Sequence, residues 1–334
     1  MTDAAPGDGA STSDGEVAAQ PAVSRIAYLG PQGTFTESAA RLLTGSDEPG
    51  ALQPYGDISD VLRAVDEGAV EVGVVPIENT LEGSVTATLD ALAFDTDLLI
   101  QGELELPISL VAAARPGVDL ASVTEVVSHP VALAGSRRWL TNTLPDADRT
   151  PAASTARAAE TVAASDAAAV AIVNQLAAEH YGLEVVARDI SDRQGNTTRF
   201  IVVGRGVPAP TGWDKTSIVV FIEANRPGAL LQLLEIFAER ELNLTKIESR
   251  PTKAELGEYC FFLDIEGHLT GERVGDALAA VKRTHRDIKV LGSYRRSGAR
   301  STAEADRIRE DDASYRLADA WLASWREQVR DPDS

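Results

Sequence analysis

The strongest constraint on the fold is an alternation between short apolar runs with strand character and segments whose apolar residues recur at helical spacing. It begins at Arg25 and continues to about residue 205. RIAYLG (residues 25–30), AVEVGVVPI (69–77) and TRFIVVG (198–204) are strand-like, whereas ISDVLRAVDEG (58–68) and STARAAETVAAS (154–165) are helix-like. This alternation predicts an α/β fold in which a parallel or mixed sheet is covered by helices on both faces.

A proline- and glycine-rich segment, RGVPAPTGWDK (205–215), interrupts the alternation and predicts a linker over residues 206–214. Residues 215–294 then follow the order strand, helix, strand, strand, helix, strand, which is that of a ferredoxin-like βαββαβ unit. The remaining segment, 295–334, is a charged tail in which Leu317, Trp321 and Trp325 recur every four residues. That spacing predicts an amphipathic helix docked on the body of the protein or on a partner subunit.

The charge balance restricts the classes of partner. The 334 residues carry a formal net charge of -20, which argues against nucleic acid or an anionic membrane surface as the main partner. No apolar run approaches the ~18 residues of a transmembrane helix. Residues 1–24 are acidic, rich in small residues and without the apolar core of a signal peptide, so we expect a disordered N-terminal lead and a cytoplasmic protein.

The sequence gives little indication of a metal-binding site or of an internal disulfide bond. Cys260 is the one cysteine, and its apolar setting, YCFFL (259–263), is typical of a buried structural thiol. The four histidines, His129, His180, His268 and His285, have no metal-ligand spacing to cysteine or acidic residues. We therefore expect no metal site.

Polar residues gather where predicted strands end and predicted helices begin. In YLGPQGTFTESAA (28–40), a turn leads into a helix at Thr34, where free amide groups and hydroxyls suit a carboxylate or a phosphate. In VVPIENTLEGSV (74–85), a buried strand stops at Asn79 and a helix restarts after Ser84. Each junction fits an ordinary helix cap equally well, but the carboxyl ends of strands in open α/β sheets are also where ligands bind.

The same arrangement recurs at SHPVALAG (128–135), at Thr155 and in NTTRFIVVG (196–204), where Thr198 and Arg199 precede an apolar run. His129 is more typical of a structural cap than of a general acid. Together the junctions predict one crevice lined by threonine, serine, asparagine and helix N-termini, with Arg199 as its cation. The alternative for Arg199 is an ion pair with an acid that braces the loop.

Several of these segments are recognisable. AYLGPQGTFTESAA (27–40), GVVPIENTLEGSV (73–85), SHPVALA (128–134) and NTTRFIVVG, in this order, resemble prephenate dehydratases. RPGALLQLLEIFAERELNLTKIESRP (226–251) is similar to the phenylalanine-sensing ACT domain that follows the catalytic region in that family. The resemblance implies a catalytic region over 25–205 with two lobes like those of type II periplasmic binding proteins, the second at about 105–180. It also implies that the βαββαβ unit at 215–294 is an ACT domain.

The activity implied by the resemblance is the conversion of prephenate to phenylpyruvate, with loss of carbon dioxide and water, in L-phenylalanine biosynthesis. Because the product is aromatic, the reaction has a large driving force and we expect no cofactor. The essential threonine of the family's Thr-Arg-Phe motif falls on Thr198, which would stabilise the departing hydroxyl. The residues expected to bind the substrate are Thr34, Asn79, Ser84, Thr155, Arg199 and Phe200.

Feedback inhibition by L-phenylalanine follows from the same resemblance. The residues expected to bind the effector are Asn225, Pro227, Gly228, Ala229 and Leu230 at a helix N-terminus, and Glu248, Ser249 and Arg250 in the partner motif. The alternative is that these residues only turn the chain. ACT domains associate side by side, so we expect a homodimer or a homotetramer.

One departure and two rival functions accompany this interpretation. Val131 and Gly135 stand in a stretch where the family commonly has glutamine. If one of those glutamines contacts the substrate in the family, that contact is missing here or is replaced by water. One rival is arogenate dehydratase, which takes the aminated substrate. The other is a solute-binding or amino-acid-sensing protein with the same two-lobed fold and no turnover; the missing signal peptide and the intact Thr-Arg-Phe sequence count against it.

Overall fold

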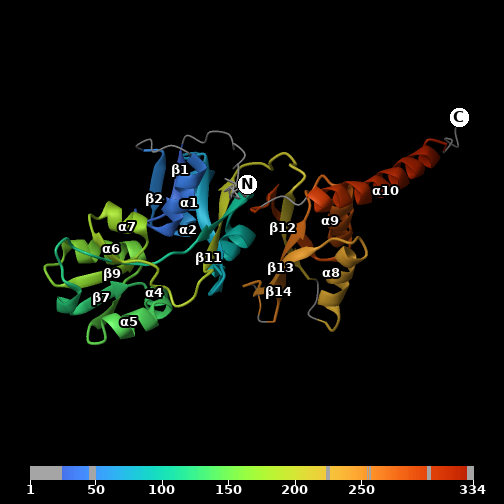
Figure 1. Cartoon of the computed structure of the whole chain (residues 1–334). Helices are drawn as coiled ribbons and strands as arrows, with labels where there is room; N and C mark the ends of the chain where they lie inside the picture. Colours follow the sequence, from blue (N-terminus) through green and yellow to red (C-terminus); the bar gives the residue numbers. More distant parts are fainter. Residues whose placement is uncertain are drawn as a thin grey trace, which may run out of the picture.

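The computed structural model describes residues 25–44, 50–222, 226–253, 255, 257–298 and 302–328, without the side chains of 302–311. The expected N-terminal lead over residues 1–24 lies outside these ranges. In the described ranges the chain forms two lobes and a C-terminal unit that lie in a row, as Figure 1 shows in green, blue and orange. The predicted mixed α/β architecture is confirmed.

Lobe one is built on five strands in the order β5-β11-β3-β1-β2. Their bounds are β1 (Ile26–Leu29), β2 (Leu52–Tyr55), β3 (Val72–Asn79), β5 (Leu99–Pro107) and β11 (Thr197–Gly204), and the short β4 (Gly83–Ser84) pairs with β3. Helix α1 (Phe35–Thr44) packs on one face of this sheet, and α2 (Ile58–Asp66) and α3 (Thr86–Asp90) pack on the other. Alternate residues of β11 enter each core, Phe200 and Val202 on the α1 side and Ile201 and Val203 on the α2 side, as the two-residue period of a strand requires.

Lobe two has its own five-stranded sheet in the order β10-β6-β9-β7-β8. The strands are β6 (Val111–Ala114), β7 (Glu125–Ser128), β8 (Asp148–Pro151), β9 (Ala169–Val173) and β10 (Glu184–Ala187). The helices are α4 (Pro130–Gly135), α5 (Arg137–Thr143), α6 (Thr155–Ala164) and α7 (Gln175–His180). Most of the side chains in its two apolar clusters are alanine and valine, which lets helices and sheet approach closely. Strand β10 extends this lobe beyond the boundary near residue 180 that was expected from the sequence.

Two crossings connect the lobes. Residues 108–110 lead from β5 into β6, and residues 188–196 lead from β10 back into β11. The crossings are hydrogen-bonded to each other, because the Ile108 amide donates to the Asn196 carbonyl over 2.8 Å. Strand β11, which begins at Thr197, therefore starts directly at the junction between the lobes.

The C-terminal unit has the predicted βαββαβ order. It comprises β12 (Asp214–Phe221), α8 (Ala229–Ala238), β13 (Leu244–Pro251), β14 (Tyr259–Glu266), α9 (Glu272–Thr284) and β15 (Asp287–Arg295). Its strands lie in the order β13-β14-β12-β15, all antiparallel, with α8 and α9 on one face.

The sheets of lobe one and of the C-terminal unit are one continuous sheet. Strand β15 pairs in parallel with β5 through Gly292 and Ile100. A Cβ atom on Gly292 would lie 2.3 Å from the Ile100 carbonyl oxygen, so only glycine permits this approach. The uncovered face of the C-terminal sheet contributes Val219 and Phe262 to the apolar cluster that also holds Ile100 and Leu92 of lobe one. The two parts thus share a hydrophobic core.

The C-terminal tail contains the long helix α10 (Thr302–Arg326), which extends away from the body (Figure 1). It is tied to the C-terminal unit where Arg273 of α9 meets Asp312, with Nε 3.3 Å from Oδ1. Trp321 and Trp325 stack edge to face, yet their side chains are 64% and 54% exposed. The expectation that these tryptophans dock on the body is therefore wrong for this chain by itself, because the helix has left the body before it reaches them.

Candidate active site

A cavity of about 660 Å³ lies between the two lobes. Both lobes and both crossings contribute to its walls, as expected for a ligand site in a two-lobed protein. Its polar lining includes Thr34, Thr36, Asn79, Glu82, His129, Arg137, Ser154, Thr155, Arg193, Asn196 and Thr198. Of the expected substrate-binding residues, Thr34, Asn79, Thr155 and Phe200 lie at the cavity, together with the expected catalytic Thr198.

Thr198 and Asn79 form a hydrogen-bonded pair at the cavity wall. They lie opposite each other on the antiparallel strands β11 and β3, which places the Asn79 side-chain nitrogen 2.9 Å from the Thr198 hydroxyl oxygen. Thr198 is only 9% exposed, so its side chain is almost fully enclosed by its surroundings.

The orientation of the Asn79 amide follows from its other hydrogen bonds. Its side-chain oxygen accepts from the backbone amides of Leu81 and Glu82 over 2.9 and 3.2 Å. The nitrogen must then face Thr198 and Asn196, whose side-chain oxygen it also approaches to 2.9 Å. Because Thr198 accepts this hydrogen bond, its own proton remains available to donate.

Helix α1 presents its N-terminus to the cavity, although several of its polar groups are already in use. The Thr34 hydroxyl donates to the Leu29 carbonyl and accepts from the Glu37 amide, so it serves as a cap. The Gly33 amide donates to the buried Glu37 carboxylate over 2.7 Å. The backbone amides of Phe35 and Thr36 have no acceptor within the helix, so they remain for a ligand.

Lobe two contributes the N-termini of α4 and α6. Ser154 caps α6 by accepting from the Arg157 amide over 3.0 Å, and Thr155 follows it at the cavity wall. His129 precedes α4 and makes no side-chain cap hydrogen bond. Val131 and Gly135, the positions that depart from the family pattern, both line the cavity, so that part of the wall has no side-chain amide to offer.

Two arginines that sequence reasoning did not select are the cations of this cavity. Arg137, the first residue of α5, and Arg193, in the second crossing, both line it. Neither makes an ion pair within the described residues, whereas the adjacent Arg138 is held by Asp192. A signal was present in the sequence, because Arg137 lies two residues after the SHPVALAG segment and Arg193 lies three residues before NTTRFIVVG.

Arg199 lies outside the cavity, contrary to the expectation that it binds substrate. Successive side chains of a strand point to opposite faces of the sheet. Because the side chains of Thr198 and Phe200 in β11 point toward the cavity, that of Arg199 points away from it. Its guanidinium contacts Glu103 through Nε over 2.7 Å and Asp264 of the C-terminal unit through Nη1 over 2.8 Å. Burial by itself would lower the pKa of Arg199, but Tyr294, Asp264 and Glu103 raise it above the ordinary value. The alternative that Arg199 pairs with acids describes this geometry.

Ser84 is also turned away from the cavity, toward β13. Its hydroxyl donates to the Glu248 carboxylate and accepts from the Lys246 ammonium over 2.7 Å. The expectation that Ser84 orients substrate does not fit this position, because Lys246 and Glu248 both belong to the C-terminal unit.

The described residues among those expected to bind phenylalanine do not all lie on one surface. Asn225 lies outside the described residues. Gly228 has a φ of 85°, which glycine adopts readily, and it leads Ala229 and Leu230 into α8. On β13, Glu248 faces lobe one, and so does Arg250, which pairs with Asp90 at 3.1 Å; the intervening Ser249 is exposed on the other face.

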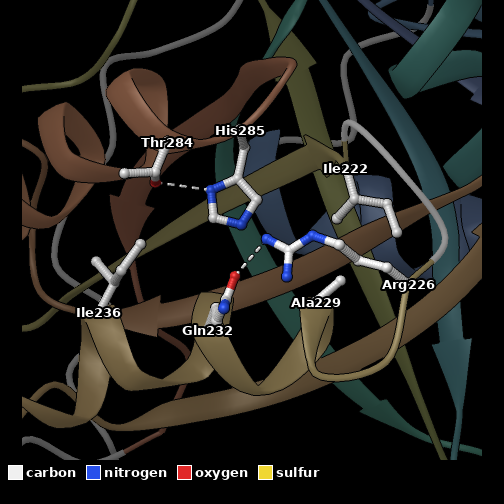
Figure 2. A pocket seen from close by; sticks show the side chains of 7 residues that line it. All are labelled: Ile222, Arg226, Ala229, Gln232, Ile236, Thr284 and His285. Atoms are coloured by element: carbon white, nitrogen blue, oxygen red, sulfur yellow. Dashed lines mark hydrogen bonds between the residues drawn. The ribbon is translucent and has the colours of Figure 1, made fainter.

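A second cavity, of about 350 Å³, lies beside α8 (Figure 2). It is lined by Ile222, Arg226, Ala229, Gln232, Ile236, Thr284 and His285. The Arg226 guanidinium donates to Gln232 over 2.6 Å. Ala229 is therefore the one expected effector residue, among those described, that lines this cavity.

Further features of the described residues concern the cysteine, the possible metal ligands and the helices. Burial raises the pKa of Cys260 to about 11, so this thiol is protonated near neutrality. No group of three or more histidine, cysteine or acidic residues in the described part of the chain is arranged to hold a metal ion. Among the described helices, none is both long enough and apolar enough to cross a membrane.

Comparison with known families matches both parts of the chain. The family model described as prephenate dehydratase matches residues 26–207, and that of the ACT domain matches residues 216–283. The prephenate dehydratase of Mycolicibacterium vanbaalenii is 45% identical over 283 residues, which cover 80% of this chain and 90% of that protein. The prephenate dehydratase of Amycolatopsis methanolica is 43% identical over 90% of this chain and 98% of that protein.

Solved structures give the same result. A crystal structure of prephenate dehydratase in complex with L-Phe from Arthrobacter aurescens is 40% identical, with a TM-score of 0.78, and the match covers 91% of this chain and 99% of that chain. The prephenate dehydratase from Staphylococcus aureus is 27% identical with a TM-score of 0.69, over 81% of this chain and 99% of that chain.

Proposed function

This chain belongs to the prephenate dehydratase family, and on that premise we propose that it converts prephenate to phenylpyruvate for L-phenylalanine biosynthesis. The observation that carries the proposal is the hydrogen bond from Asn79 to Thr198 at the wall of the interlobe cavity. Because the Thr198 oxygen accepts this hydrogen bond, its proton would be free to donate to a substrate in the cavity.

The chemistry requires help at one bond. When the ring carboxylate leaves as carbon dioxide, its bonding electrons move into the ring and the ring hydroxyl departs with the electrons of its C–O bond. The hydroxyl must be hydrogen-bonded or protonated as it leaves, and a positioned donor is typically worth about 10²–10⁴-fold. Thr198 would supply this hydrogen bond, with the proton itself delivered through water. Aromatisation provides the driving force, so the mechanism uses no cofactor.

The two substrate carboxylates need positive partners, and the cavity offers them from different elements. Arg137 of lobe two and Arg193 of the crossing would each bind one carboxylate. The free backbone amides at the N-termini of α1 and α6 would add neutral donors. Thr155 and Phe200 would then orient the ring against the Asn79 side of the cavity.

The ACT domain would make the enzyme sensitive to L-phenylalanine. The relative from Arthrobacter aurescens was crystallised with L-Phe, and this chain has a glycine turn into α8 that such a ligand could approach closely. We take Pro227 to Leu230 as the first part of the effector site, with Ser249 on the exposed face of β13 offered to a second subunit. A cytoplasmic homodimer or homotetramer would complete the site. Inhibition requires that L-phenylalanine bind one arrangement of the protein more tightly than the other.

The test is turnover of prephenate by purified protein, followed through the absorbance of phenylpyruvate. The wild type should turn over, and Thr198→Ala should lose about 10²–10⁴-fold in kcat. Absence of wild-type turnover would refute the dehydratase function, and near-normal turnover by Thr198→Ala would refute the role of Thr198. Addition of millimolar L-phenylalanine to the same assay should lower the rate, and an unchanged rate would refute the effector role.

A further inference from the structure

The chain neighbours of the two active-site residues point to the opposite face of the sheet. Thr198 and Asn79 face the cavity, whereas Arg199 and Glu78, which are also paired across β11 and β3, face the ACT domain. Arg199 Nη1 and Glu78 Oε2 are 3.4 Å apart. The two strands that hold the active-site pair therefore carry a second, charged pair on their other side.

Arg199 is anchored by the ACT domain through two strands. Its Nη1 contacts Asp264 of β14 over 2.8 Å, and its Nη2 donates to the Tyr294 hydroxyl of β15 over 2.9 Å. Ser217 joins these partners, because its hydroxyl contacts both Asp264 and Tyr294. The Arg199 and Asp264 side chains are 10% and 7% exposed, so solvent replaces neither partner if the other is removed.

Glu78 is anchored in the same way by a third strand. Lys246 of β13 approaches the Glu78 carboxylate to 3.2 Å and the Ser84 hydroxyl to 2.7 Å. Strands β13, β14 and β15 of the ACT domain thus all contact residues adjacent in sequence to Thr198 or Asn79.

The pairing of β11 with β3 is irregular next to Thr198. It shifts register between Arg199 and Phe200, where Ile77 of β3 is the extra residue of a bulge. A bulge interrupts the ladder of backbone hydrogen bonds, so the pairing with β3 holds the residues beside it less firmly than a regular ladder would. On its other side β11 pairs with β5 in unbroken register from Thr197 to Val202. The side-chain contacts of Arg199 add a further constraint on the face of the strand opposite the cavity.

We propose that Asp264 and Tyr294 of the ACT domain are positioning residues for the reaction, and that they act through Arg199 to hold the Thr198 hydroxyl against Asn79. The proposal rests on the dehydratase function proposed above. It means that the Thr198–Asn79 geometry depends on where the ACT sheet sits, since a displacement of about 1 Å at a reacting group can cost about 10²-fold in rate.

The test compares three variants of the full-length enzyme without added phenylalanine. Asp264→Asn keeps the size of the side chain but removes the negative charge that faces the guanidinium, and Tyr294→Phe removes one hydroxyl from the same cluster. Asp90→Asn is the matched control, because Asp90 also joins lobe one to the ACT domain, through Arg250 and Lys253, but contacts neither β11 nor β3 in the described contacts. Thermal melts identify any variant that is unfolded. If Asp264→Asn proves to be unfolded, the kcat of Tyr294→Phe tests the proposal in its place.

We expect kcat to fall about tenfold in Asp264→Asn and severalfold in Tyr294→Phe, with KM within about twofold and Asp90→Asn close to wild type. An unchanged kcat in both cluster variants, or an equal loss in Asp90→Asn, would overturn the proposal. In an Asn79→Ala background, where the active-site hydrogen bond is already absent, Asp264→Asn should lower kcat by a smaller factor than in wild type; equal factors in both backgrounds would overturn it too. Since each variant is compared with an active wild type and with Thr198→Ala, these outcomes are distinct from a failure of the dehydratase function itself.

Discussion

Replacing Asn79 by aspartate changes one atom and should reverse the direction of the Thr198 hydroxyl. The Asn79 oxygen that accepts from Leu81 and Glu82 is retained in aspartate, so the loop after β3 keeps its hydrogen bonds. The nitrogen that donates to Thr198 over 2.9 Å becomes a carboxylate oxygen. Hydrogen bonds to a carboxylate are about twice as strong as neutral ones, so the Thr198 proton would turn toward residue 79 and away from the cavity.

The expected loss can be bounded from that geometry. Thr198 would no longer donate to the departing hydroxyl, and a positioned donor contributes about 10²–10⁴-fold. Water in the cavity can replace part of this, so we expect kcat of Asn79→Asp to fall by about 10²–10³-fold, or about 3–4 kcal/mol of transition-state stabilisation. Steady-state measurement of phenylpyruvate formation gives kcat and KM separately.

Asn196→Asp is the matched control. Asn196 lines the same cavity, and its side-chain oxygen already accepts from Asn79, so the variant adds the same charge without removing the donor to Thr198. Repulsion of a dianionic substrate should raise its KM severalfold with little change in kcat. Equal losses of kcat in the two variants would refute the reasoning, because the added charge would then be sufficient to explain both.

Three further outcomes are expected. Arg137→Ala and Arg193→Ala should each raise KM for prephenate about 10- to 100-fold in steady-state assays, since a hydrogen bond to a charged group contributes about 1.5–3 kcal/mol. KM values within twofold of wild type would exclude both arginines as ligands of the substrate carboxylates. Because burial raises the pKa of Cys260 to about 11, roughly one thiol in a thousand is ionised at pH 8. Thiol reagents should therefore react with Cys260 only after the enzyme is denatured. Rapid reaction with the folded enzyme would contradict the burial of this thiol. Gly292→Ala should destabilise the protein by about 1–3 kcal/mol in denaturant titrations, because the added Cβ would meet a carbonyl oxygen of β5. The control Gly275→Ala lies in a helix, where the added Cβ makes ordinary contacts, so it should be neutral or stabilising. Equal effects of the two substitutions would refute the close approach at Gly292.

The fold and the family could be predicted from the sequence because both depend on patterns within short segments. The strand–helix alternation, the βαββαβ order after residue 215 and the motifs around Asn79 and Thr198 are local, and the structure and the comparisons bear out the fold and family that they predicted. The prominence of Thr198 in its motif likewise agrees with its position at the cavity.

The face of the sheet to which each individual side chain points could not be predicted from the sequence. Arg199 is next to Thr198 in sequence, and an arginine beside an expected catalytic residue suggests an anion site, but a strand turns neighbours to opposite faces. Only the position of the ACT sheet, which is set by contacts far apart in sequence, shows that the opposite face holds Asp264. The position of Arg193 could not be predicted for a related reason, because a polar turn becomes a cavity wall only when the second lobe lies across from it.

A regulatory domain that shares a sheet and a core with its catalytic region is not a detachable module. Cutting the chain in the linker before β12 would uncover Ile100 and Leu92 and would leave the Arg199–Glu103 pair facing solvent on one side. The exposed edge of β5 would offer unpaired backbone groups to other chains, which is a common route to aggregation. A version of this enzyme freed from feedback is therefore better sought by point substitution on the ACT surface than by truncation, and an ACT domain borrowed from a relative would have to bring a glycine at the position of Gly292.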